Sequence, residues 1–254
     1  MVATHQSDID NLRKAGSILA EVLTETAKLV APGVTAAELD LAAERMIKEK
    51  GGKPAFLNYK PSGAAYPFPA VLCVSINDEV VHGIPTEDKV VKEGDLVMLD
   101  LGVSYNGFFA DAALTVAVGE VDVVGMKLLD ASREALSEAL KVVKAGAYVG
   151  DIGSAIERVA RKYNFTIAKD LGGHAIGKVP HEKPYIPNEG EAGTGEVLKE
   201  GLVIAIEPIL CEGKPHITLA EDEWTYRTRD GLRSTEFEQT VIVTKEGCEV
   251  LTPF

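Results

Sequence analysis

The sequence predicts an α+β fold in which helices cover antiparallel strands. Apolar residues recur at helical spacing in four segments, at about residues 7–31, 35–50, 122–143 and 151–163. Two long apolar runs meet at Asn106-Gly107, a dipeptide that strongly favours a β-hairpin. The order of helix, helix, strand and hairpin occurs twice along the chain, which indicates an internal duplication.

The first two helices have recognisable ends. Ser7 is the expected N-cap of the first helix, and Pro32-Gly33 ends it. The second helix begins at the capping box Thr35-Ala-Ala-Glu38 and stops at Gly51-Gly52.

Strands follow this pair of helices. Residues 70–76 are expected to form a strand that ends in an Asn77-Asp78 turn, and residues 89–119 the two strands of the Asn106-Gly107 hairpin.

The second half repeats this organisation. A shift of 113 residues places Gly33 on Gly146, and a shift of 107 places residues 92–100 on 199–207, with identical Lys, Glu and Gly. Chance could explain the match at a shift of 113, which concerns the helices, if it stood alone. Two matches in the same order, both ending on an acid, favour duplication. No linker separates the halves. We therefore predict one domain, residues 1–254, with pseudo-twofold halves at about 1–120 and 121–254.

Composition narrows the class of protein. The 254 residues include 26 Lys and Arg and 39 Asp and Glu, a net charge of −13, and 46% are hydrophobic. These values are typical of a soluble globular protein and disfavour sequence-independent binding to nucleic acid. The three cysteines, Cys73, Cys211 and Cys248, fit neither a disulfide framework nor a zinc motif, so we expect a reducing cytoplasm. Neither a signal peptide nor a membrane span is expected.

The hairpin brings two aspartates together. With Asn106 and Gly107 as its loop, Asp111 lies opposite Gly102, and Asp100 is two residues along the same strand. Both carboxylates then point to one face of the sheet as diagonal neighbours. Gly102 is expected to leave the space between them empty.

Two further acids interrupt apolar runs in the second half, Glu207 in LVIAIEPIL and Glu238 in TEFEQTVIV. A solvated sheet face is the simpler explanation for one strand acid, but it would have to hold at all four positions. Four convergent carboxylates repel one another unless cations lie between them. The acids therefore favour a metal site.

One histidine could complete such a site. His174 lies in LGGHAIG, where glycines let a ligand approach closely, although a structural role is common for a lone histidine in such a turn. One imidazole with four carboxylates suits two divalent ions such as Mn, Fe, Co or Zn better than a structural zinc.

These motifs resemble a known family. In order and spacing, five of them are similar to the five-ligand dimetal set of the pita-bread peptidases: LDLG with Asp100, FADA with Asp111, GGHAIG with His174, IEPI with Glu207 and EFEQT with Glu238. The motifs VVHGIP with His82, HEKP with His181, and Trp224-Thr225 narrow the resemblance to type I methionine aminopeptidases, over nearly the whole chain. The implied fold is the pita-bread (creatinase/aminopeptidase) fold.

The resemblance implies a mechanism and a ligand set. A hydroxide bridging two divalent ions would attack the scissile carbonyl and release the initiator methionine from nascent proteins whose second residue is small. Asp100 would bind one ion, Asp111 and Glu238 would bridge both, and His174 and Glu207 would complete the other. Glu207 would also shuttle the proton.

The resemblance also implies residues that contact the substrate. His181 would donate to the carbonyl oxygen, and His82 would contact the scissile amide or the substrate near it. Phe68, Cys73 and Trp224, with these histidines, would line the site, and the aromatic edges would suit a thioether.

The sequence departs from the family at three places. Phe68 stands where Tyr is common, Pro180 where Phe is frequent, and Leu101-Gly102-Val103 where a Thr is often seen. These departures leave the ligands untouched and bear on the pocket and the rate.

Other functions fit less well. Xaa-Pro aminopeptidases and dipeptidases share the ligands but normally have a sizeable N-terminal domain, whereas about thirty residues precede Gly33 here. A non-catalytic binding protein of this fold would typically have lost ligands, and a two-metal nuclease fits the acidic charge poorly. We expect a cytoplasmic monomer with no membrane or specific nucleic-acid partner, in transient contact with the ribosome.

Overall fold

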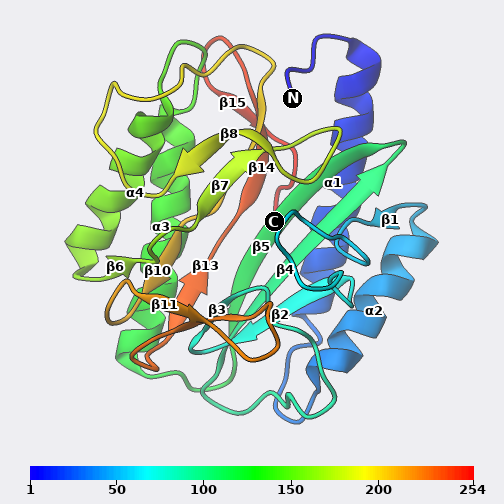
Figure 1. Ribbon diagram of the computed structural model, residues 1–254, viewed down its shortest axis with the longest axis vertical. Helices are drawn as coiled ribbons and strands as arrows, with labels where there is room; N and C mark the ends of the chain where they lie inside the picture. Colours follow the sequence, from blue (N-terminus) through cyan, green and yellow to red (C-terminus); the bar gives the residue numbers. More distant parts are fainter.

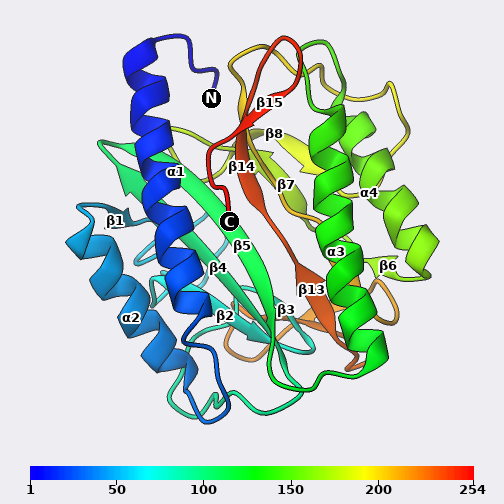
Figure 2. The same cartoon turned by 180° about the vertical axis from the view of Figure 1, so that it is seen from behind.

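The computed structural model describes residues 1–254 and confirms the α+β class. Its helices lie on one side of the sheets, behind them in Figure 1 and in front of them in Figure 2. They are α1 (Gln6–Ala27), α2 (Ala36–Glu49), α3 (Val123–Val142) and α4 (Val149–Tyr163).

All the strand pairs are antiparallel, in two larger and two smaller sheets. The first larger sheet holds β1 (Lys53–Pro54), β2 (Leu72–Ile76), β4 (Leu96–Tyr105) and β5 (Phe108–Ala117). The second has the order β15 (Cys248–Val250), β14 (Gln239–Val243), β9 (Val203–Ile206), β7 (Gly172–Ala175), β8 (Glu182–Pro187). One smaller sheet has the order β13 (Ser234–Glu236), β10 (Ile209–Cys211), β6 (Thr166–Ile167). The other has the order β11 (Ile217–Leu219), β12 (Tyr226–Thr228), β3 (Glu79–Val81).

The ends of α1 differ from the prediction. The helix begins at Gln6 with His5 at the N-cap position, so Ser7 is not the cap. It ends at Ala27 rather than near residue 31, because the N–H groups of the next residues bond three residues back: Leu29 to the Thr26 carbonyl (3.0 Å) and Val30 to the Ala27 carbonyl (3.3 Å). Such bonds tighten and close the last turn.

The other helix signals were more accurate. Thr35 and Glu38 form the predicted capping box, in which the Glu38 N–H donates to Thr35 Oγ1 and the Thr35 N–H to Glu38 Oε2. Asp122 caps α3 by accepting from two N–H groups, and α4 begins two residues earlier than expected, at Val149.

The hairpin register is confirmed, with Gly102 opposite Asp111. The expectation of empty space above Gly102 was wrong. A Cβ there would lie 2.6 Å from Phe56 Cε1 and 2.9 Å from the Cβ of Ala55, whose N–H donates to the Gly102 carbonyl. Glycine therefore admits the segment after β1 against the hairpin rather than leaving a gap.

The two halves repeat the same backbone contacts at related positions. Gly33 and Gly146 both have positive φ, 92° and 89°, and each donates its N–H to an equivalent carbonyl, that of Val91 or Leu198, at 2.9 Å. The isolated bridge Thr35↔Val90 likewise corresponds to Tyr148↔Val197. These matches support the expected division into pseudo-twofold halves, which stays a prediction.

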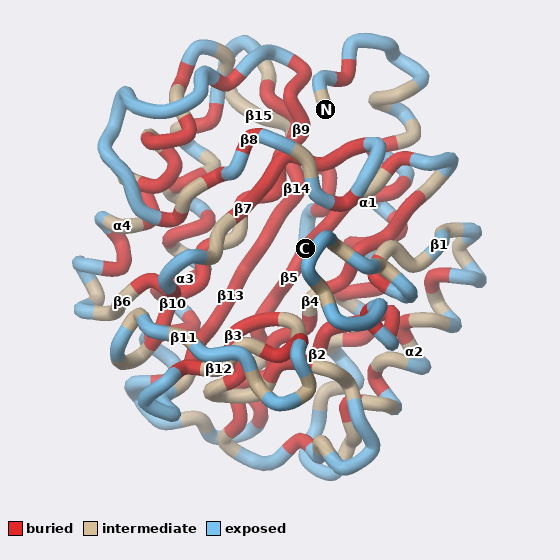
Figure 3. Tube along the Cα trace, in the orientation of Figure 1, coloured by how far each residue is buried: buried red, intermediate tan, exposed pale blue.

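A shared core joins the two halves. A cluster of 46 buried residues draws on all four helices and on both larger sheets, and the buried central strands contrast with the exposed outer loops in Figure 3. None of the helices is long and apolar enough to cross a membrane.

Candidate metal centre

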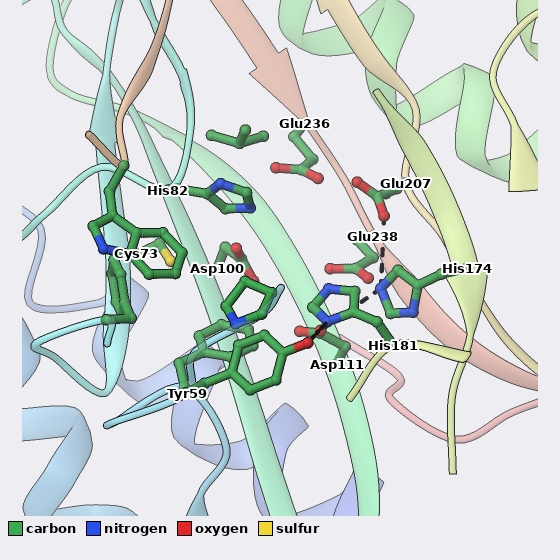
Figure 4. A pocket seen from close by; sticks show the side chains of 15 residues that line it. Tyr59, Cys73, His82, Asp100, Asp111, His174, His181, Glu207, Glu236 and Glu238 are labelled. Atoms are coloured by element: carbon green, nitrogen blue, oxygen red, sulfur yellow. Dashed lines mark hydrogen bonds and ion pairs between the residues drawn. The ribbon is translucent and has the colours of Figure 1, made fainter. Parts of the chain in front are cut away.

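One cavity of ≈ 260 Å³ brings together all ten residues predicted for the site. One end of it is apolar and the other is rich in carboxylates (Figure 4). The lining residues are Phe56, Tyr59, Pro61, Phe68, Cys73, Val81, His82, Asp100, Asp111, His174, His181, Glu207, Trp224, Glu236 and Glu238.

The β4–β5 hairpin supplies the first two acids. Asp100 pairs with Ala113 across the hairpin, and Asp111 pairs with Gly102, so both side chains lie on the face that lines the cavity. The backbone of Asp111 is tied to the other half by Thr240. The Thr240 hydroxyl accepts from the Asp111 N–H (2.9 Å) and donates to its carbonyl (2.7 Å).

The second half supplies Glu207 and Glu238. Glu207 directly follows β9, and the Asn188 side-chain amide donates to its carbonyl at 2.9 Å. Glu238 was expected inside one continuous strand, but it lies between β13 and β14. The strand is interrupted because β13 pairs with β10 whereas β14 pairs with β9, and at the switch Glu238 pairs instead with Ala113 of β5.

His174 is oriented to present one ring nitrogen to the acids. Its Nδ1 lies 3.0 Å from the Ala175 carbonyl, which favours a hydrogen on Nδ1 and leaves the Nε2 lone pair free. Nε2 lies 4.0 Å from Asp111 Oδ2 and 3.8 Å from Glu207 Oε1. Burial, and then the neighbouring His181, lower the pKa of His174 to about 3, so this imidazole is neutral at physiological pH.

Burial raises the pKa of every carboxylate at this end. The pKa of Asp100 rises to about 7 and that of Glu207 to about 8, in Glu207 with a contribution from the charge of Asp100. The pKa values of Asp111, Glu236 and Glu238 are also raised well above those of ordinary carboxyl groups. A nearby cation reverses this preference for the neutral form.

The donor set fits divalent metal ions. Two atoms that bind one such ion at about 2.0–2.2 Å are at most about 4.4 Å apart, and the contacts of His174 Nε2 with Asp111 and Glu207 lie within that limit. Three groups have ligand atoms within 4.8 Å of one another. Two of them, Asp100–Asp111–Glu238 and His174–Glu207–Glu238, share Glu238, and the third is Asp111–His174–His181. In addition, Asp111 Oδ1 is buried with no hydrogen-bond partner, as expected for an atom that a cation should satisfy.

His82 is held in a backbone conformation that is uncommon for residues other than glycine. Its φ is 59°, and the following residue, Gly83, could not accept a side chain because a Cβ would lie 2.2 Å from the Val74 carbonyl oxygen. The Gly83 carbonyl accepts from the Val74 N–H, which fixes this turn. Burial, and then His181, lower the pKa of His82 to about 4. A neutral imidazole therefore faces the cavity.

His181 lies at the mouth of the cavity, immediately before β8. Its Nδ1 is 3.0 Å from the hydroxyl of Tyr59, and the two rings stack with centroids 5.4 Å apart. The His181 ring also lies close to the ring of His174, with centroids 4.3 Å apart. Burial lowers the pKa of His181.

Aromatic rings form the apolar end. Phe68 and Trp224 meet edge to face with centroids 5.1 Å apart, and Phe56 meets Phe68 in the same way at 6.5 Å. Cys73 is buried with them and lies opposite Asp100 in the β2–β4 register, where the two ends of the cavity meet.

Comparison with known proteins assigns the family. A sequence model of metallopeptidase family M24 matches residues 10–245. The chain belongs to this family. It is 43% identical, over 97% of its length, to a methionine aminopeptidase of Aquifex aeolicus, and it covers 96% of that protein. The sequence resemblance is therefore confirmed.

Solved structures confirm the pita-bread fold of this M24 chain. A methionine aminopeptidase from Thermotoga maritima superposes with a TM-score of 0.94 at 40% identity, with complete coverage of both chains. A prolidase from Pyrococcus furiosus superposes with a TM-score of 0.78 at 23% identity and is covered to 66%, which shows the shared fold alone.

Sequence reasoning missed five residues that line the cavity of this M24 chain: Phe56, Tyr59, Pro61, Val81 and Glu236. Glu236 could have been found, because it is two residues from Glu238 and strand periodicity places such residues on one face. It is 2% exposed, and its Oε2 has no hydrogen-bond partner. Phe56, Tyr59 and Pro61 lie in an irregular segment that has no periodic signal.

Proposed function

We propose that this protein is a methionine aminopeptidase that removes the initiator methionine from nascent polypeptides whose second residue is small. The observation on which the proposal rests is the single cavity that joins a set of metal ligands to a short aromatic pocket. The relatives that match over the full length, in Aquifex aeolicus and Thermotoga maritima, are methionine aminopeptidases.

Five residues would hold two divalent ions. Asp100 would bind one ion, His174 and Glu207 the other, and Asp111 and Glu238 would bridge both. The overlap of the two ligand sets at Glu238 supports this arrangement. When bound, the ions would supply a nucleophilic water at neutral pH and polarise the scissile carbonyl. Mn, Fe, Co and Zn all suit these donors.

Three residues would act on the substrate and its protons. Glu207 would take the proton released during attack, since its carboxylate lines the cavity 3.8 Å from His174 Nε2. His181 would donate to the carbonyl oxygen as negative charge develops there. His82 would contact the scissile amide. Their common position on one cavity supports these roles.

The aromatic end would receive the methionine side chain. Phe68, Trp224 and Cys73 offer ring edges and a thiol to an unbranched thioether. The methionine and the reacting groups would share one cavity of ≈ 260 Å³.

The remaining expectations concern the protein's surroundings. All three cysteines are free, which supports a reducing compartment, and we propose the cytoplasm, where nascent chains are available. We also propose that the chain acts as a monomer in transient contact with the ribosome, with no membrane or specific nucleic-acid partner.

A peptide-cleavage assay across a series of metals tests the function. The full chain is incubated with Met-Gly, Met-Leu and Xaa-Pro peptides in the presence of Mn²⁺, Fe²⁺, Co²⁺ or Zn²⁺, and with EDTA as a control. We expect release of methionine from the Met-Gly peptide, little release from Met-Leu, and none with EDTA. Cleavage of the Xaa-Pro peptides alone would contradict the proposal.

A further inference from the structure

The contact between Tyr59 and His181 joins the two halves of the chain at the mouth of the cavity. The residues are 122 positions apart, and their side chains make a hydrogen bond of 3.0 Å between the Tyr59 hydroxyl and His181 Nδ1. Figure 4 shows the His181 ring between Tyr59 and the predicted ligands. Tyr59 therefore contacts His181, to which the proposed function assigns a chemical role, on the side away from the predicted ligands.

Tyr59 is held in place by its own backbone. Its N–H donates to the Phe56 carbonyl at 2.8 Å, and its carbonyl accepts from the Phe68 N–H at 2.9 Å. These bonds fix both sides of the residue within an otherwise irregular segment. The phenol ring then stacks on His181 with an interplanar angle of 26°. The backbone of Tyr59 is therefore fixed independently of His181, and its side chain reaches His181 from there.

The direction of the hydrogen bond follows from the available partners. A neutral imidazole has one donor nitrogen and one acceptor nitrogen, and a phenol has one hydrogen to donate. The Tyr59 hydroxyl has no other hydrogen-bond partner in the protein. If Nδ1 donated to Tyr59, the phenol hydrogen would have no acceptor within the protein, whereas donation from Tyr59 to Nδ1 pairs it.

We propose that Tyr59 is a positioning residue for His181. Its hydroxyl donates to Nδ1, keeps the imidazole hydrogen on Nε2, and so leaves an N–H donor for the carbonyl oxygen of the substrate. A ring nitrogen of His181 comes within 4.8 Å of ligand atoms of Asp111 and His174, so the imidazole lies beside the place where the carbonyl would react. The role rests on the proposed function, because it acts through the hydrogen bond that His181 makes to the substrate.

Tyr59→Phe removes the hydroxyl and preserves the stacked ring. The matched control is Tyr163→Phe, which also removes a hydroxyl with one side-chain hydrogen bond, to Glu134 Oε2 at 2.8 Å, but on α4, away from the cavity. For cleavage of a Met-Gly peptide we expect Tyr59→Phe to lower kcat about three- to tenfold and to change KM less than about twofold. Tyr163→Phe should leave both constants unchanged.

A double-mutant cycle separates positioning from simple lining of the cavity. In a His181→Ala background, Tyr59→Phe should cause no further loss, because the residue through which it acts is gone. An equal loss of kcat in both backgrounds would overturn the proposal, as would wild-type kcat in the single variant.

The tautomer of His181 gives a readout that needs no turnover. Long-range ¹H–¹⁵N spectra of the full chain, labelled at histidine nitrogens and loaded with diamagnetic Zn²⁺, should show His181 with its hydrogen on Nε2, and a mixture of tautomers in Tyr59→Phe. A hydrogen on Nδ1 in the wild type, or an unchanged tautomer in the variant, would refute the role of Tyr59. Failure of the wild type to release methionine would instead refute the proposed function.

Discussion

The two ends of the cavity are built in different ways. The acidic end lies on or directly beside regular strands of both halves, and its backbone is tied across the halves where Glu238 pairs with Ala113 and Thr240 bonds Asp111. The apolar end depends on connecting segments, since neither Phe68 nor Trp224 lies in a helix or a strand.

This difference indicates what each end needs from the fold. Ligand atoms must be held together against mutual repulsion, which requires backbone positions that cannot drift. The proposed methionine pocket requires a shape lined with apolar groups, which packed aromatic rings on irregular segments can provide. Substitutions at the two ends should therefore differ in size and in kind.

The largest effect is expected at the acid shared by the two ligand sets. Glu238→Gln keeps the shape of the side chain but removes the charge that would hold both ions. We expect methionine release to fall about a thousandfold or more, with loss of bound metal measured by elemental analysis. Asp111→Asn should behave in the same way. Normal metal content and activity in either variant would refute the bridging assignment.

A smaller effect is expected at His181, which lies between the two ends. His181→Ala removes the proposed donor to the carbonyl oxygen, so kcat should fall about a hundredfold while the metal content stays normal. Loss of metal in this variant would identify His181 as a ligand instead, a possibility that its nearness to Asp111 and His174 makes worth testing.

The same contrast explains what could be predicted from the sequence. The positions of Asp100 and Asp111 followed from the hairpin signal, because the register of a two-residue loop fixes which side chains share a face. Their partners in the second half followed from the repeat. Glu236 obeys the same periodicity and stands first in the EFEQT motif, but the resemblance assigned a role only to Glu238.

The residues of the apolar end could be predicted only through the family resemblance. No local rule places Tyr59 or Phe56 in the cavity, since their segment has no periodic pattern and is held by tertiary contacts such as that of Phe56 with Gly102. For the same reason the sequence suggested empty space at Gly102. The sequence of a strand does not show which distant segment packs against it.

The apolar end should tolerate change with a moderate loss. Phe68→Leu removes an aromatic edge beside Trp224, so we expect kcat/KM for Met-Gly peptides to fall about tenfold, with metal content unchanged. Discrimination between methionine and norleucine at the first position should also weaken. Unchanged kinetics toward both peptides would place the methionine side chain elsewhere in the cavity.

The smallest effect concerns stability and arises only at the acidic end. Without metal, carboxyl groups whose pKa is raised by folding bind protons more tightly in the folded state than in the unfolded state. The protein therefore loses stability as the pH rises toward and through their folded pKa values, about 7 for Asp100 and about 8 for Glu207.

Histidines with lowered pKa values contribute little above about pH 6.5, where they are neutral in both states. Between pH 6.5 and 8, calorimetry should show the Tm of the metal-free chain falling by about 5 °C or more, and that of the Mn²⁺-loaded chain staying nearly constant. Phe68→Leu should retain the slope of Tm with pH, whereas Asp111→Asn should reduce it, because it removes one of the repelling charges. Equal slopes with and without metal would mean that these carboxylates do not form the metal centre.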